Sequence, residues 1–390
     1  MFIKRSKTHG TAHLMKSDRI KIYFCTTAPS KNYKSWSNIP YLLHKNLEKK
    51  GYIVKNFVMW ELEPLKTLFN LPVRVLNKFW NLGTTYFYVR TPVHYFFTYA
   101  YSRCIGLISA KLDVMLVQGF SYPLHNGKNR QIIVGDWPSE YLFEKFLKRK
   151  PSRLERNSIN RENAVIERAD AIITLFPNVR EYMLQKYKNQ NIYYFGNVVN
   201  VDDKVVLPAD IRERKKTSRR FIFVGQSFYL RGALQLIEAA RNIRAQGYDC
   251  EVDIIGIDSS LIGAKYNWLK VYGYLDKQNP RDKQLYYELM SNARMFVNTT
   301  PGWSGFQALL EAMYFYNPIL VRPNESLNSF FPDLTSVAHI LKEGETNLES
   351  LLVECLTDNI RYQKMSDAAR SAVKLLTWDN FTSGLIALLK

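Results

Sequence analysis

The chain has 390 residues, of which 46% are hydrophobic and 23% are charged. These values are typical of a globular protein and exclude wholesale disorder, and the length suffices for two ordinary domains. The charge is unusual, because 54 Lys and Arg residues against 35 Asp and Glu residues give a net charge of +19. A surface this basic attracts polyanions or anionic lipid.

Nothing in the sequence predicts export or a membrane span. Residues 1–18 are basic and polar without the apolar core of a signal peptide, so we expect a flexible extension there. The most apolar stretch, residues 91–110, is interrupted by His94 and Arg103, which argues against a bilayer span. The four cysteines form no CxxC pair and no set with histidines, which favours a reducing compartment without structural zinc.

The first half of the chain alternates strand and helix patterns, as a parallel sheet requires. Strands are predicted at residues 20–25, 52–59, 114–117, 131–134, 169–175 and 192–195. Helical patterns lie at residues 36–50, 61–111, 139–149, 161–168 and 177–187. A polar, basic stretch containing Pro208 follows, and we expect the interdomain linker between residues 201 and 219.

The second half repeats this alternation, so the sequence predicts an α/β fold. Strands are expected at residues 221–224, 252–256, 268–272, 295–298 and 317–321, with helices at residues 233–240 and 283–292. A last apolar helix follows residues 377–381. We expect a first domain at residues 19–203, a second at 204–375 and a C-terminal helix within 376–390.

Two segments of the second half are suited to binding a nucleotide sugar. The strand 221–224 runs into a turn, Gly225 to Gly232, that brings free backbone N–H groups and the Arg231 guanidinium to the start of a helix. This arrangement suits a phosphate, although Arg231 also fits as a solvated residue at a helix start. Later, a Gly-containing loop opens a helix that carries Glu311 near its start. A carboxylate there suits ribose hydroxyls, or it only complements the helix dipole.

These segments resemble the donor half of GT-B retaining glycosyltransferases, family four (glycosyl transferases group 1) in particular. The pairs Arg231-Gly232 and Glu311-Ala312 match the family's pattern, and the resemblance runs from about residue 114 to the C-terminus. Gln226 stands where many members carry Arg, and Trp303 or Ser304 stands where a first Glu is expected. The resemblance implies two Rossmann-like domains facing across a cleft, a retaining reaction, and neither metal nor cofactor.

The same resemblance implies the site residues. The donor-binding set would be Gly225, Gln226, Arg231, Gly232, Ser304, Gly305, Phe306, Gln307 and Glu311. Arg231 would also stabilise the leaving diphosphate. In the first domain, Asp136 follows the strand 131–134, close to where family members often carry a His. We expect Asp136 to act in catalysis on the acceptor hydroxyl, or only to start the next helix.

The basic runs predict the partners. Residues 145–156 and the aromatic, basic region 66–103 indicate a surface that faces an anionic membrane. We therefore expect a cytoplasmic enzyme, peripheral to the inner face of the plasma membrane, that moves a sugar to a lipid-linked surface glycan. The alternatives are a catalytically idle GT-B-like scaffold, a basic nucleic-acid-binding protein, and a sugar-nucleotide epimerase. No nucleic-acid module is recognised, so no nucleic-acid partner is expected.

Overall fold

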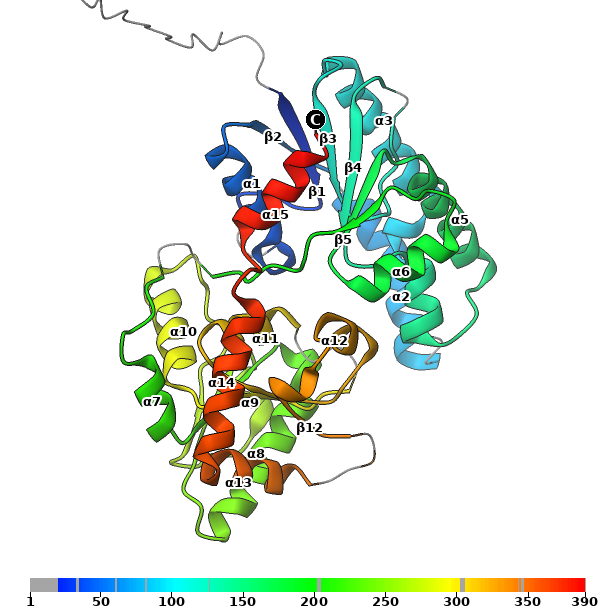
Figure 1. Ribbon diagram of the computed structural model, residues 1–390. Coiled ribbons are helices and arrows are strands. Elements are labelled where there is room, and N and C mark those ends of the chain that lie inside the picture. The colour runs from blue at the N-terminus through cyan, green and yellow to red at the C-terminus, as the bar shows by residue number, and fades with distance from the viewer. Residues whose placement is uncertain are drawn as a thin grey trace, which may run out of the picture.

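The computed structural model describes residues 20–32, 35–59, 62–80, 83–125, 127–201, 205–301, 306–342, 344 and 347–389. The predicted flexible extension, residues 1–18, lies outside this range. Two six-stranded parallel sheets form two lobes (Figure 1). The predicted α/β class with two Rossmann-like halves is confirmed.

The first sheet has the strand order β2-β1-β3-β4-β5-β6. Its strands are β1 (Lys21–Thr26), β2 (Ile53–Val58), β3 (Val114–Gln118), β4 (Arg130–Gly135), β5 (Ala171–Thr174) and β6 (Ile192–Tyr194). Every residue of β3 and β5 is buried. Strands of a parallel sheet are buried along their whole length in this way when helices cover both faces of the sheet.

The helices of the first lobe differ from the prediction in several places. They are η1 (Ser35–Asn38), α1 (Ile39–Lys49), α2 (Glu63–Trp80), η2 (Tyr88–Arg90), α3 (Pro92–Ile108), α4 (Ser139–Tyr141), the π-helix η3 (Leu142–Leu147), α5 (Arg153–Arg168) and α6 (Pro177–Lys186). The segment predicted as one helix over 139–149 is a short α turn that widens into the π-helix. Helix α5 starts eight residues before the predicted 161, because Ser152 and Glu155 form a capping box.

The second sheet has the order β12-β11-β10-β7-β8-β9. Its strands are β7 (Arg220–Val224), β8 (Glu251–Ile255), β9 (Leu269–Val271), β10 (Met295–Asn298), β11 (Ile319–Val321) and β12 (Ala338–Ile340). Its helical elements are α7 (Ile211–Thr217), η4 (Ser227–Tyr229), α8 (Leu230–Ala245), α9 (Ser259–Ile262), α10 (Pro280–Asn292), α11 (Phe306–Tyr314), α12 (Glu325–Phe330), η5 (Leu334–Ser336), α13 (Leu348–Thr357) and α14 (Asn359–Val373).

The linker prediction was partly wrong, because helix α7 lies inside the stretch 201–219. The Lys215 side chain of α7 is buried, and its ammonium donates to Met290 O at 2.7 Å, Ala293 O at 2.5 Å and Asn317 Oδ1 at 2.6 Å. These bonds fix α7 to the second lobe. The helix was not predicted because it lies in a run of Lys and Arg residues. In the sequence, the one buried lysine cannot be distinguished from its solvated neighbours.

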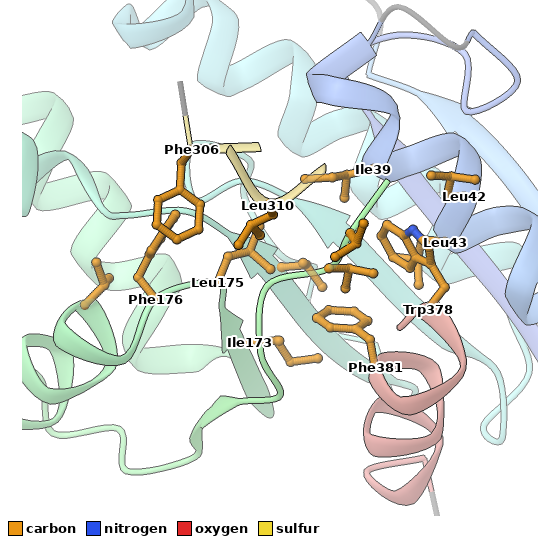
Figure 2. Packing of buried hydrophobic residues seen from close by; sticks show 14 of the residues in the cluster. Ile39, Leu42, Leu43, Ile173, Leu175, Phe176, Phe306, Leu310, Trp378 and Phe381 are labelled. Carbon is orange, nitrogen blue, oxygen red and sulfur yellow. The ribbon is translucent and has the colours of Figure 1, made fainter. Parts of the chain in front are cut away.

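The last helix, α15 (Trp378–Ala387), packs against α1 of the first lobe (Figure 1). Trp378 donates from Nε1 to Asn200 Oδ1 at 3.2 Å, and Lys50 pairs with Asp379 at 2.7 Å. Figure 2 shows Trp378 and Phe381 among the buried side chains of the first lobe. The two lobes are therefore joined twice, by the chain after β6 and by the chain before α15.

Candidate functional site

A pocket lies at the carboxyl end of each sheet. In open parallel sheets this edge is where ligands bind, since the loops that leave the strands there form a crevice. We call the two pockets the first-lobe pocket and the second-lobe pocket. Their volumes are about 500 Å³ and about 210 Å³.

The second-lobe pocket contains Glu311, whose carboxylate is almost completely buried on α11. Its Oε2 pairs with the ammonium of Lys277 at 2.5 Å and accepts a hydrogen bond from the Tyr286 hydroxyl at 2.6 Å. Burial, and then the Glu311 charge, raise the pKa of Tyr286 well above its usual 10, so this phenol stays a donor. Within the described residues, both partners bind Oε2, which leaves Oε1 for a ligand.

Two glycines form a wall of the same pocket by close backbone approach. A Cβ on Gly256 would lie 2.6 Å from the carbonyl oxygen of Gly225, and Gly256 has φ +93°. Gly225 and Gln226, two of the residues predicted to bind the donor, follow β7 and line the pocket. The sequence analysis missed Gly256, which follows β8 as Gly225 follows β7.

Arg231, which was predicted to bind the donor together with Glu311, does not line the pocket that contains Glu311. It lines a separate groove together with Leu234 and Glu238, which share its face of α8. The next residue, Gly232, faces the end of β10 and the segment after it, since a Cβ there would lie 2.4 Å from the Thr300 hydroxyl and 3.0 Å from Asn298 Oδ1. The cation that pairs with Glu311 is Lys277.

The start of α11 lies at the boundary between the two lobes. The Phe306 ring packs edge-on against Phe176 of the first lobe at 4.9 Å (Figure 2). Gln307 lines the second-lobe pocket and donates from Nε2 to Val198 O at 2.6 Å. Two further predicted donor-binding residues, Ser304 and Gly305, lie outside the described residues.

The first-lobe pocket contains Asp136, which follows β4 as predicted. Its Oδ2 accepts a hydrogen bond from Trp36 Nε1 at 2.9 Å. Burial raises the pKa of Asp136 to about 6, although the Trp36 bond opposes this shift. A carboxyl group with this pKa is mostly ionised near neutrality and more basic than an ordinary Asp, as a group that accepts a proton must be.

The short helix η1 connects the two pockets. Trp36 lines the first-lobe pocket and Asn38 lines the second-lobe pocket. Residues two apart in a chain have Cα atoms within about 7 Å, so the two pockets approach each other here. Trp36 and Asn38 have φ of 41° and 68°, a left-handed conformation that costs a non-glycine residue energy and is frequent at functional sites.

The sequence analysis missed Lys277, Tyr286 and Trp36. Lys277 follows β9 at the carboxyl edge of the second sheet, a position that the topology alone would have marked. Tyr286 lies inside α10 and gives no such signal. Within the described part of the chain, no group of three metal-ligating side chains occurs, and no helix is both long and apolar enough to cross a membrane.

No protein-family model matches the chain, and no curated protein matches it in sequence. Solved structures do resemble it. WaaG, a glycosyltransferase involved in lipopolysaccharide biosynthesis, aligns with a TM-score of 0.63 and 13% identity over 94% of this chain and 99% of its own. A glycosyltransferase from Rickettsia africae aligns with a TM-score of 0.62 and 11% identity over 96% and 98%.

TarM aligns over a smaller share, with a TM-score of 0.55 and 14% identity. The match covers 76% of this chain and 58% of TarM, so this chain spans less than two thirds of TarM's length. A variant of TarM from S. aureus has been solved with fondaparinux, alpha-GlcNAc-glycerol and UDP. At these identities the likeness establishes the architecture, and with its two facing parallel sheets the chain has the GT-B fold.

Proposed function

We propose that the protein is a glycosyltransferase that moves a sugar from a nucleoside diphosphate to a glycan acceptor. The observation that carries the proposal is the pair of adjoining pockets at the carboxyl edges of the two sheets, one holding Glu311 and the other Asp136. A donor in one lobe and an acceptor in the other meet where η1 joins the pockets. The structural neighbours that are glycosyltransferases support the same activity.

The donor occupies the second-lobe pocket in this proposal. Glu311 Oε1 accepts hydrogen bonds from the ribose hydroxyls, and Lys277 holds the carboxylate in place through Oε2. The diphosphate lies between the turn at Gly225 and Gln226 and the start of α11, where the first backbone N–H groups of the helix point outward. TarM, solved with UDP, gives a precedent for a nucleotide on this fold.

The acceptor occupies the first-lobe pocket. The Asp136 carboxylate accepts a hydrogen bond from the attacking hydroxyl and so orients it, while the hydrogen bond from Trp36 fixes the carboxylate. We also propose that the reaction retains the anomeric configuration and needs neither metal nor cofactor. This part of the proposal rests on the resemblance to family four.

A thermal-shift panel of UDP, GDP, dTDP and CMP tests the donor site. We expect one nucleotide to stabilise the wild type, because a ligand that binds the folded state alone raises the unfolding temperature. Glu311→Gln should abolish the shift, since an amide loses an acceptor site for the ribose hydroxyls. Arg231→Ala should retain the thermal shift, because Arg231 lines another groove. A shift lost in Arg231→Ala but kept in Glu311→Gln would overturn this placement of the donor.

We further propose that the acceptor is lipid-linked and that the enzyme binds the cytoplasmic face of an anionic membrane through α2. This helix buries Val73 and exposes most of its other large apolar side chains. The exposed ones are Leu68, Phe69, Leu71, Val75, Leu76, Phe79 and Trp80. A contiguous apolar face of this kind marks an interaction surface.

Positive charge surrounds the end of α2. Arg74 and Lys78 are exposed on the helix itself. Arg149 donates to the carbonyl of Gly83 at 2.6 Å and so ties the basic segment 148–156 to the chain that follows α2. Arg149 pairs with Glu155 at 2.8 Å, but Arg74 and Lys78 favour an anionic bilayer over a neutral surface, at about 1 kcal/mol for each basic residue near the leaflet.

A further inference from the structure

The first-lobe pocket contains buried polar atoms that make no hydrogen bond within the described residues. Gln118, the last residue of β3, is 5% exposed, and its Oε1 has no partner among these residues. Arg90, at the end of η2, has a buried Nη1 that likewise has no partner there. Buried polar atoms are nearly always hydrogen-bonded, so an unpaired acceptor and an unpaired donor in one pocket indicate a ligand that supplies both.

A hydroxyl group meets both needs, because it donates one hydrogen bond and accepts others. The pocket walls include the aromatic side chains of Trp36, Phe120 and Trp137. Apolar and aromatic walls with a few placed polar groups are typical of small-molecule sites, and the volume of about 500 Å³ lies in their usual range of about 300–1,000 Å³. A sugar ring fits both the aromatic walls and the polar groups, since it has apolar C–H faces and a rim of hydroxyls.

The charges in the pocket disfavour an anionic ligand. Asp136 and Glu162 both line it, against the single guanidinium of Arg90. Glu162 already accepts hydrogen bonds from the Ser139 backbone N–H, the Ser139 hydroxyl and the Ser121 hydroxyl. A phosphate or carboxylate placed here would face two carboxyl groups and one guanidinium, and the like charges disfavour its binding.

We infer that the first-lobe pocket binds a neutral sugar unit, held by Gln118 and Arg90 with one hydroxyl against Asp136. This inference rests on the proposed function and narrows it. The group that receives the new sugar is then itself a sugar, and not the phosphate of a lipid carrier. The enzyme would extend a glycan, and an earlier glycosyl transfer must supply its acceptor.

Saturation-transfer NMR with neutral methyl glycosides of glucose, galactose, mannose and N-acetylglucosamine tests the inference. We expect at least one to bind the wild type and to bind Gln118→Leu about tenfold more weakly, because the variant loses a buried hydrogen-bond acceptor. Gln246→Leu, at an exposed position after α8, is the matched control and should bind as the wild type does. Arg90→Lys provides a second variant that retains the charge but not the guanidinium geometry, and it should also weaken binding.

Inorganic phosphate and methyl glucuronide serve as the anionic probes. Binding of either anion in the absence of glycoside binding would overturn the inference, and so would failure of every probe to bind. Nucleotide binding, measured by thermal shift on the same samples, reports on the proposed donor site separately. A wild type that binds nucleotide but no neutral glycoside therefore refutes the sugar pocket and leaves the proposed transferase standing.

Discussion

Asp136 is a residue whose ionisation opposes folding. Its pKa is raised to about 6 by burial, above the usual value near 4 for an unfolded chain. The folded state therefore binds more protons than the unfolded state between these two values, and the stability contribution present below about pH 4 is lost as the pH rises through about 6. Such a cost persists where a carboxylate serves a function.

Asp136→Asn should remove this pH dependence. The amide oxygen still accepts the Trp36 hydrogen bond, and no charge has to be buried. We expect the variant to gain stability relative to the wild type between about pH 4 and pH 6 and to be the more stable protein at pH 7.5. Urea unfolding at four pH values measures this difference. A constant difference across the range would show that Asp136 does not titrate with a raised pKa.

Lys277 and Glu311 form a buried pair whose partners depend on each other. Lys277→Met leaves the Glu311 carboxylate uncompensated, and we expect a loss of about 3 kcal/mol in unfolding free energy. The double variant Lys277→Met with Glu311→Gln should recover much of that loss, because no buried charge remains. Urea unfolding of the three variants gives the coupling energy. Additive losses would contradict the pairing.

Helix α2 exposes apolar side chains that an amphipathic helix usually buries. An amphipathic helix normally buries its apolar stripe in the core, but α2 turns two aromatic side chains at its end, Phe79 and Trp80, outward with exposed fractions of 70% and 64%. Burying each in lipid would contribute about 1.5–3 kcal/mol. These two side chains therefore carry the proposal that α2 binds a membrane.

Replacing Phe79 and Trp80 together by Ser should reduce flotation with vesicles of phosphatidylglycerol and phosphatidylethanolamine at least tenfold. The matched control is Ile360→Ser on α14, which removes a side chain of 73% exposure from the second lobe and should leave flotation unchanged. Far-UV circular dichroism checks that α2 still forms. Equal flotation of the double variant and the control would remove α2 from the membrane proposal.

Helix α15 holds the two lobes together through Trp378, which is buried and bonded to Asn200. Trp378→Ala should cost about 3–5 kcal/mol, the usual range for deleting a buried aromatic side chain. Leu375→Ala, close in sequence but exposed, should change stability by less than about 0.5 kcal/mol. Urea unfolding compares the two. Equal, small effects would show that α15 packs weakly on the first lobe.

At the scale of the whole molecule, the alternation of strands and helices sufficed to predict two parallel sheets. Apolar runs such as Val114–Val117 are buried on both faces of a sheet, and this pattern is local. The position of Glu311 was also predictable from local sequence, because it lies near the start of a helix that follows a strand of the second sheet.

The partners of each site residue were not predictable in the same way. Arg231 and Glu311 were both predicted to bind the donor, but the groove that Arg231 lines depends on the face of α8 on which it lies. Lys277 reaches Glu311 across 34 positions of the chain, and Trp36 reaches Asp136 across 100. Such contacts depend on the fold, and no local pattern encodes them.

The central claim is that one active site spans both pockets, and turnover of the nucleotide sugar that binds tests it most directly. Release of nucleoside diphosphate should be measured for the wild type, Glu311→Gln, Asp136→Asn and Arg231→Ala, with a neutral glycoside as acceptor. We predict turnover by the wild type and Arg231→Ala, and losses of about a hundredfold or more in the other two, in line with the removal of a positioned acid–base group. Unchanged turnover in Glu311→Gln and Asp136→Asn, or no turnover of a sugar nucleotide that binds the wild type, would contradict the claim.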